Sequence, residues 1–377
     1  MRDSPRTQND KTFTFHGHPV CPLGYETQQV ETADGVTLTL FRSRPRVADP
    51  ALPPVLLVPG LGSNRFTFGL TRTHGLPHLL NELCREVWLA ELRGSRSSHV
   101  PPSARTRCDV THKLRQDLPA AIQAVRAATH TDTLDLIGHS LGGLLALLHS
   151  IDDPAIRKVV TISTPGRLDG LAGLLEKTPL MPAVARGLEK MVGGLERLAV
   201  SPLARLGGPV PHLAMGRHFL PGAVDAATRR RYLDHAVEDV PGPELAQLVR
   251  WAATGDLSGA IGRPLETALS GVRVPVLCVI SSRDKVVPET NARHLFQSLG
   301  TNDKALLRVD RQSRASRDYA HADILLASSA TRDVLEPITD WLATSVDAAS
   351  VDARFIAPAT AVAARFIAPD LRTKRTA

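Results

Sequence analysis

The sequence contains no long hydrophobic run and only four cysteines. No apolar stretch approaches the roughly 20 residues of a membrane-spanning helix, and the polar start from Met1 to Lys11 has no apolar signal core. The cysteines lack the spacing of metal ligands, so we interpret them as free thiols. These absences predict a cytoplasmic protein without an integral membrane segment and without a metal site.

A concentrated charge of one sign is also missing. Lys and Arg outnumber Asp and Glu by 45 to 38, but the net charge of +7 is spread along the chain. The one compact basic run, Arg229–Arg231, adjoins Tyr232 and is interpreted as the solvated face of a helix. Without a recognisable nucleic-acid-binding module, this charge does not indicate a nucleic-acid partner.

Short apolar segments recur in the first and last parts of the chain and predict strands. They are Val55–Val58, Val87–Ala90, Leu134–Ile137, Val159–Ile162, Val274–Ile280 and Ala305–Val309. Helical periodicity separates most of them, most clearly between Leu114 and Val125. This alternation favours an α/β fold with a mostly parallel sheet covered by helices on both faces. An antiparallel hairpin over 25–42, turning at Ala33–Gly35, is expected to precede it.

The stretch between Pro165 and Val272 carries almost no strand signal. Apolar residues at helical spacing predict one amphipathic helix from Val184 to Leu198 and another from Leu245 to Ala252. An insertion here would lie over the carboxyl ends of the strands, where open α/β sheets bind ligands. We therefore predict an inserted helical cap, with packing of no functional role as the alternative.

The chain is expected to divide into four parts. These are a core at 25–165 and 272–345, the helical cap at 166–271, an N-terminal extension at 1–24 and a C-terminal tail at 346–377. Within the tail, Ala353–Pro358 recurs as Ala364–Pro369. Two copies do not make a repeat architecture, so the tail is predicted to be a mobile or weakly docking segment.

The most informative motif is Gly-His-Ser-Leu-Gly at 138–142, which matches the Gly-x-Ser-x-Gly nucleophile elbow. A predicted strand precedes it and an apolar helix follows it. The elbow strains the serine backbone, and a Cβ at Gly138 or Gly142 would collide with a neighbouring strand or helix. Ser140 is therefore the candidate nucleophile, and an ordinary serine at a glycine-rich helix start is the alternative.

A serine of this kind needs a base and an acid, which follow in the chain order Ser, Asp, His. Asp284 comes directly after a predicted strand, where a carboxylate can point into the site, and an ordinary turn aspartate is the alternative. His321 lies in the loop after the last predicted strand, and its neutral imidazole would take the Ser140 proton. Asp323 is a second candidate acid. His139 is expected to face away from the site.

The strand Val55–Val58 runs into Pro-Gly-Leu-Gly-Ser-Asn at 59–64, a glycine-rich loop with free backbone N–H groups. The amides of Leu61 and Leu141 form the natural pair of donors for an oxyanion. A tight turn at Pro59 without a catalytic role is the alternative.

Together these segments resemble an α/β-hydrolase-fold serine hydrolase of the lipase or esterase kind, with a helical cap. The resemblance covers 25–345 and rests on Pro59–Gly62, Trp88–Gly94, the elbow, Asp284 and His321. It implies a Ser140–His321–Asp284 triad, an acyl-enzyme intermediate and a cap that shapes the acyl pocket. Pro59 departs from the histidine that lipases and esterases often carry before the oxyanion glycine.

The predicted function is hydrolysis of a carboxylic ester with a moderately apolar acyl group, on a small-molecule or lipid-like substrate. No metal or organic cofactor is implied. An acyltransferase with the same triad and a catalytically silent binding protein of the same fold are the alternatives. The acyl chain length, the mobility of the cap and the oligomeric state do not follow from the sequence.

Overall fold

The computed structural model describes residues 24–71, 74–168, 181–200 and 217–344. It also places the backbone of three two-residue strands, β1 (Thr14–Phe15), β2 (His18–Pro19) and β13 (Phe366–Ile367). The predicted N-terminal extension and C-terminal tail therefore lie almost wholly outside the described residues. Within the tail, β13 pairs antiparallel with the strand β12.

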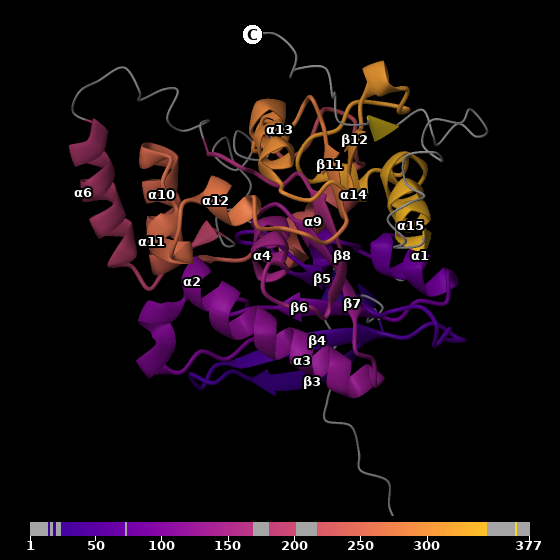
Figure 1. The fold of residues 1–377 in the computed structure, drawn as a ribbon, viewed down its shortest axis with the longest axis horizontal. Coiled ribbons are helices and arrows are strands. Elements are labelled where there is room, and N and C mark those ends of the chain that lie inside the picture. The colour runs from indigo at the N-terminus through magenta and orange to yellow at the C-terminus, as the bar shows by residue number, and fades with distance from the viewer. Residues whose placement is uncertain are drawn as a thin grey trace, which may run out of the picture.

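Nine of the described strands form the main sheet in the order β13-β12-β11-β8-β7-β5-β6-β4-β3 (Figure 1), and the others form two separate two-stranded pairs, β1 with β2 and β9 (Arg197–Leu198) with β10 (Val240–Pro241). Its members before β13 are β3 (Glu26–Glu31), β4 (Thr37–Ser43), β5 (Val55–Val58), β6 (Val87–Glu91), β7 (Leu134–His139), β8 (Ile156–Ile162), β11 (Val276–Ile280) and β12 (Lys304–Arg308). Neighbouring strands from β6 to β12 run parallel, whereas β3 and β4 form the predicted antiparallel hairpin. The mostly parallel sheet is confirmed.

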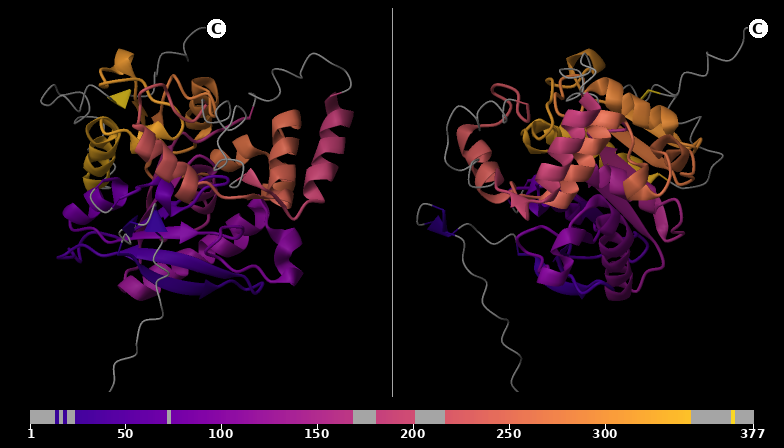
Figure 2. Two further views of the ribbon diagram at one scale, coloured as in Figure 1. Left: turned by 180° about the vertical axis from the view of Figure 1, so that it is seen from behind. Right: turned by 90° about the vertical axis from the view of Figure 1, so that its left-hand side faces the viewer.

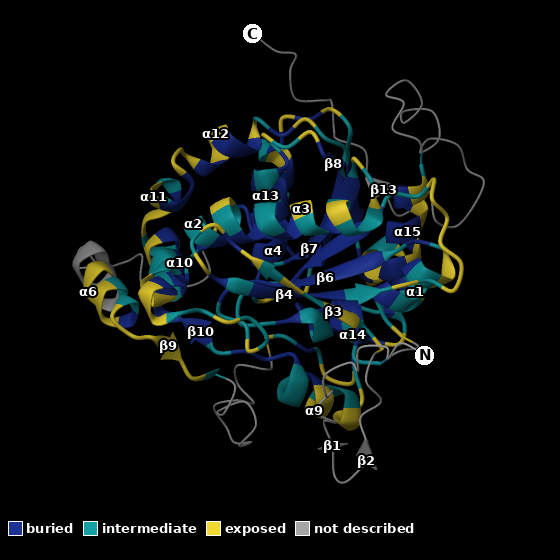
Figure 3. Cartoon of the chain, turned by 90° about the horizontal axis from the view of Figure 1, so that it is seen from below, coloured by how far each residue is buried: buried dark blue, intermediate teal, exposed yellow. Residues whose placement is uncertain are grey.

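Helices cover both faces of this sheet, because alternate residues of each strand point to opposite sides. Leu136 packs into a cluster with α3 and α4, whereas the next residue, Ile137, packs into a cluster with α1 and α15. The sheet is accordingly buried in the middle of the molecule (Figure 3). The covering helices are α1 (Leu76–Glu82), α2 (Val110–His112), α3 (Leu118–Thr129), α4 (Leu141–His149), α13 (Glu289–Ser298), α14 (Asp323–Leu326) and α15 (Glu336–Ala343).

A long segment is inserted between β8 and β11, which are neighbours in the sheet. Its described elements are α6 (Met181–Gly193), β9 (Arg197–Leu198), α9 (Ala226–His235), β10 (Val240–Pro241), α10 (Gly242–Thr254), α11 (Ser258–Ile261) and α12 (Leu265–Leu269). The helices α6 and α10 stand side by side at the edge of the molecule (Figures 1 and 2). The two predicted amphipathic helices are thus present. Among the described helices, none combines the length and the hydropathy of a membrane-spanning segment.

Neither helix buries quite the face that its apolar residues predict, which in the second helix consists of Leu245, Leu248, Val249 and Ala252. In α10 the buried side chains include Leu248, Trp251 and Glu244, and the buried Glu244 carboxylate is paired with a lysine of the core. The helix α6 ends at Gly193, before the predicted Leu198, and Met191 is 62% exposed. Since α6 packs mainly against α10, one neighbouring helix cannot cover its whole apolar stripe.

The last part of the inserted segment packs with the core. Leu257, Leu265 and Leu269 share one hydrophobic cluster with α4 and the sheet. The predicted cap, which ends at residue 271, therefore contains helices whose side chains pack in the hydrophobic cluster of the core. The cap itself remains a prediction.

Candidate active site

Ser140 occupies the tight turn between β7 and α4 with φ 54° and ψ −125°. A positive φ is unusual for a residue with a side chain and marks local strain. The Ser140 N–H donates to the Ile162 carbonyl at 2.8 Å, so the adjacent strand β8 holds the turn in place. The strained serine predicted from the motif is thus present at the carboxyl end of a central strand.

The glycines on both sides of Ser140 are required by close backbone contacts. A Cβ at Gly138 would lie 2.3 Å from the Gly143 nitrogen, and one at Gly142 would lie 2.1 Å from the Val58 oxygen. Both distances are far below van der Waals contact with rigid backbone atoms. The steric reason given for the motif is therefore confirmed.

His321 and Asp284 form a buried pair. Asp284 Oδ2 lies 2.8 Å from His321 Nδ1, and the two residues are 5% and 4% exposed. The other carboxylate oxygen, Oδ1, accepts the N–H groups of Val286 and Val287 at 2.8 and 2.9 Å. Burial alone would raise the pKa of Asp284, but the His321 ring and the two N–H donors lower it below the usual value. Asp284 is therefore held as a carboxylate.

The second candidate acid, Asp323, contacts backbone rather than the His321 ring. Its Oδ1 accepts the Ala320 N–H at 2.5 Å, and its Oδ2 accepts the Leu220 N–H at 2.7 Å. Burial raises its pKa to about 6. Asp323 thus joins the His321 loop to the inserted segment, and the structure pairs His321 with Asp284 instead.

The expectation that His139 faces away from the site is wrong. Its ring lies 4.6 Å from the His321 ring, and its Nε2 is 2.9 Å from the His321 carbonyl oxygen. Burial, followed by the nearby His321, lowers the pKa of His139 to about 3. His139 therefore stays neutral and donates from Nε2 to this carbonyl. It ends a strand that is buried between two others, so its side chain packs against the neighbouring loop.

A third histidine, His218, comes from the inserted segment and was not predicted. Its ring lies 5.5 Å from the His321 ring in an edge-to-face arrangement, and its carbonyl accepts the Ala322 N–H at 2.9 Å. Burial lowers its pKa to about 3. The surrounding Pro- and Gly-rich sequence has no periodicity that could have placed this residue.

The glycine-rich loop after β5 lies directly against the nucleophile turn. A Cβ at Gly60 would be 2.9 Å from the Ser140 Cβ. Leu141 is the first residue of α4, so its N–H has no intrahelical acceptor. The Leu61 N–H donates to no backbone carbonyl among the described residues. Neither of the two amides predicted for the oxyanion thus has a backbone acceptor among the described residues. The two segments that carry them meet at Ser140.

Within the described chain, the Ser140 hydroxyl makes no hydrogen bond to the His321 ring, a contact that often tightens only when substrate binds. A cavity of about 220 Å³ lies beside the loop after β6, between Ser95 and Pro241, and no side chain of Ser140, Asp284 or His321 lines it. The described residues contain no cluster of metal-binding side chains.

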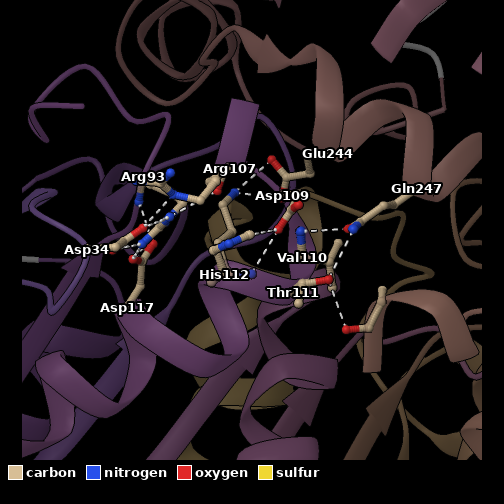
Figure 4. Close-up of polar contacts among 12 residues, drawn as sticks. Asp34, Arg93, Arg107, Asp109, Val110, Thr111, His112, Asp117, Glu244 and Gln247 are labelled. Atoms are coloured by element: carbon tan, nitrogen blue, oxygen red, sulfur yellow. Dashed lines mark hydrogen bonds and ion pairs between the residues drawn. The ribbon is translucent and has the colours of Figure 1, made fainter. Parts of the chain in front are cut away.

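A buried polar network, also unpredicted, ties the core to the inserted segment (Figure 4). Arg93 is fully buried and its guanidinium donates to Asp117 and Asp34, the latter from the β3–β4 turn. Next to it, Lys113 Nζ donates to both carboxylate oxygens of Glu244 at 2.6 and 2.7 Å. The sequence did not predict these pairs, because their partners lie far apart in the chain and no local pattern of charged residues connects them.

The order of the strands, the strained serine after β7 and the buried His–Asp pair beyond β11 and β12 define a class of protein, the α/β-hydrolase fold. The sequence profile of the family described as alpha/beta hydrolase fold matches residues 53–313, more than half of the chain. The chain belongs to this family and has the α/β-hydrolase fold.

The chain is similar in sequence to a probable lipase and in fold to an esterase and a lipase. A probable lipase of Schizosaccharomyces pombe is 28% identical over 157 residues, 37% of this chain and 34% of that protein, so the chain matches about a third of its length. The structure of an esterase from Exiguobacterium antarcticum matches with a TM-score of 0.59 at 14% identity, over 85% of this chain and 100% of that chain. The monoacylglycerol lipase of Paleococcus ferrophilus matches with a TM-score of 0.55 at 20% identity, over 80% of this chain and 98% of that one. Both structures share the fold.

Proposed function

We propose that the protein hydrolyses a carboxylic ester with a moderately apolar acyl group through a Ser140–His321–Asp284 triad. The observation that carries this proposal is the buried 2.8 Å contact between His321 Nδ1 and Asp284 Oδ2. This contact leaves Nε2 of the same ring as the remaining proton acceptor. His139, which directly precedes Ser140, contacts the His321 ring and so links the nucleophile turn to the proposed base.

In the proposed reaction, His321 Nε2 takes the hydroxyl proton while Ser140 Oγ attacks the ester carbonyl. Asp284 holds the imidazole in the required tautomer and stabilises its protonated form. The amides of Leu61 and Leu141 donate to the oxyanion of the tetrahedral intermediate. The alcohol leaves with the proton from His321. In the second half of the reaction His321 takes a proton from water, the water oxygen attacks the acyl-enzyme carbonyl, and Ser140 leaves with the proton as the free acid is released.

The inserted segment is proposed to act as a cap that shapes the acyl pocket. Two contacts support this role, namely the His218 ring beside His321 and the bond from the Leu220 N–H to Asp323. Both bring the insertion to the loop that carries the proposed base. The apolar residues of the inserted helices favour an acyl group over a charged substrate, and the relatives named above are lipases and esterases.

Turnover of a chain-length series of p-nitrophenyl esters tests the proposal, together with labelling by a fluorophosphonate probe. We expect wild-type turnover and labelling to be lost in Ser140→Ala and kept in Ser150→Ala, a buried serine at the other end of the same helix. Equal activity in Ser140→Ala would overturn the mechanism.

Added alcohols separate hydrolysis from acyl transfer. Turnover that depends on the added alcohol, without release of free acid, would contradict hydrolysis and support an acyltransferase. A native protein that neither turns over the esters nor reacts with the probe would contradict the triad and support a catalytically silent binding protein.

A further inference from the structure

The loop after β5 is joined to the inserted segment through backbone contacts. Ser63 and Val237 form an isolated antiparallel bridge, and the Glu238 N–H donates to the Gly62 carbonyl at 2.8 Å. Gly62 has φ 57°, and a Cβ there would lie 3.0 Å from Val240 Cγ2. The loop is therefore shaped by residues that are remote in the sequence but in direct contact with it.

A buried side-chain contact joins the same two segments. Asn64 Nδ2 donates to Glu238 Oε1 at 2.6 Å and to the His235 carbonyl at 2.7 Å. Its Oδ1 accepts the Phe66 N–H at 3.1 Å and so caps the turn that ends the loop. Asn64 and Glu238 are each 3% exposed. Asn64 thus fixes the end of the loop only while both of its acceptors in the insertion stay in place.

Glu238 is the centre of this contact because both of its oxygens are engaged. Arg96, from the loop after β6, donates from Nε to Glu238 Oε2 at 2.8 Å. The same guanidinium donates to the carbonyls of His235 and Val237, at 3.1 Å each. One carboxylate therefore connects the loops after β5 and β6 with the inserted segment. A buried carboxylate with charged and neutral donors on separate oxygens is strongly oriented.

The held loop is the one that meets the nucleophile. Gly60 lies against Ser140, since a Cβ added to it would be 2.9 Å from the Ser140 Cβ, and the Ser63 hydroxyl donates to the Gly60 carbonyl at 3.1 Å. Leu61 lies between this contact and the Gly62 carbonyl, which accepts the backbone N–H of Glu238. Its amide direction is therefore set from both sides, by the turn at Ser140 and by the insertion.

We propose that the carboxylate of Glu238 is a positioning group for the oxyanion hole: it holds the loop through Asn64, beside the backbone bond from the Glu238 N–H to the Gly62 carbonyl, so that the Leu61 amide faces Ser140. The inference rests on the proposed function, since it assigns Leu61 the oxyanion role described there. It means that the inserted segment completes the catalytic machinery as well as covering it.

An oxyanion donor works only within hydrogen-bond distance of the developing charge, so a small shift of the loop weakens it. Such a shift acts in the transition state more than in the bound substrate, and the loss is expected in kcat rather than in KM. We expect Glu238→Ala and Asn64→Ala to lower kcat about 10- to 100-fold, with KM changed less than about threefold. Glu238→Gln keeps an acceptor for Asn64 and should have an intermediate kcat.

The experiment measures kcat and KM on a p-nitrophenyl ester, with active sites counted by fluorophosphonate titration so that misfolded protein does not contribute. Glu196→Gln, a 53% exposed side chain in the same insertion, is the matched control and should keep the wild-type kcat. A second readout is the ratio of inhibition constants for an alkyl trifluoromethyl ketone and its methyl ketone analogue. Only the first forms a hemiketal oxyanion readily, so a displaced oxyanion donor should raise its inhibition constant, and the ratio should rise as kcat falls.

The outcomes separate this inference from the proposed function. If wild type is active, Ser140→Ala is inactive, and both Glu238→Ala and Asn64→Ala keep the wild-type kcat and ketone ratio, the positioning role is overturned and the triad stands. A fall in kcat in both variants with an unchanged ketone ratio would also contradict an effect on the oxyanion hole. An inactive and unlabelled wild type would overturn the proposed function and this inference with it.

Discussion

Asp284 uses its two carboxylate oxygens for different tasks. Oδ1 binds the two N–H groups of its own turn, and Oδ2 binds His321 Nδ1. The turn residue and the candidate acid are thus one and the same, and the two interpretations of this aspartate do not exclude each other. The turn contacts hold the carboxylate in place so that the second oxygen is directed to the ring.

Replacement of this carboxylate tests its role in the proposed triad. Asp284→Asn keeps the size of the side chain but can present an amide N–H to His321 Nδ1, which favours the wrong tautomer. We expect kcat on a p-nitrophenyl ester to fall about 10³- to 10⁴-fold. Asp318→Asn, three residues before His321 and with a carboxylate that accepts the Arg311 N–H, is the control and should keep its kcat. An undiminished kcat in Asp284→Asn would contradict the assignment.

His139 predicts a specific pH dependence of stability. Its pKa is about 3 in the folded protein, against the ordinary value of 6.5 that we assign to the unfolded chain. Between these values the unfolded chain binds a proton that the folded protein excludes. The contribution of His139 to the free energy of unfolding is therefore present above about pH 6.5 and is lost as the pH falls towards 3.

His139→Gln removes this titration and keeps an N–H donor for the His321 carbonyl. We expect the loss of unfolding free energy between pH 7 and pH 5 to be smaller in the variant by about 2 kcal/mol. Urea denaturation at the two pH values measures this difference. The same loss in variant and wild type would show that His139 is not the responsible group.

At the scale of secondary-structure elements, α10 is attached to the core by polar contacts as well as by packing. Its Gln247 accepts the Val110 N–H at 2.8 Å, and its Glu244 pairs with Lys113. Thr111 adds a bond to the Ala260 carbonyl of α11 at 2.9 Å (Figure 4). These contacts attach two inserted helices to the segment that precedes α3.

The Lys113–Glu244 pair should show the energetics of a buried ion pair. Glu244→Leu leaves a buried ammonium without its partner and is expected to lower the free energy of unfolding by about 3–5 kcal/mol. The double variant Lys113→Met/Glu244→Leu removes both charges and should recover most of that loss. Urea denaturation of both single variants and the double variant completes the cycle.

The exposed pair of Arg105 and Glu196 is the control for this cycle. Both side chains are about half exposed, and its coupling should not exceed about 1 kcal/mol. A double variant of Lys113 and Glu244 that is no more stable than either single variant would contradict the buried-pair account.

Elements differ in how well their sequence predicts them. The strand β5 was predicted with its exact bounds, since an apolar run of four residues between prolines leaves few alternatives. The helix α6 was predicted too long, because periodicity continues through Leu195 and Leu198 although the helix ends at Gly193. Apolar spacing records which residues prefer burial, and it does not record whether a partner is present to bury them.

At the scale of the whole molecule, the sheet and its covering helices form the centre, and α6 lies at the edge. The strands β7 and β8 are almost completely buried, whereas Met191 of α6 is 62% exposed. Figure 3 shows the same contrast between the buried strands and the mixed surface of α6. Local stability follows the number of buried contacts, so it should differ between these regions.

Native-state hydrogen exchange measures this difference. We expect the amides of α6 to exchange at least about 100-fold faster than those of β7 and β8. The helix α4, which is buried along most of its length, provides the comparison within the same molecule. Protection of α6 equal to that of β7 would contradict the view that α10 is its main support.

The sequence by itself determined the local features of this protein. The Gly-x-Ser-x-Gly motif required a strained turn because only glycine tolerates the contacts at 138 and 142, and the apolar runs required buried strands. Tertiary structure alone decided the long-range partners: which aspartate meets His321, how His139 and His218 flank it, and that Glu238 holds the loop after β5. The physical reason is that backbone strain and burial act on neighbours in the chain, whereas buried hydrogen bonds join residues that only folding brings together.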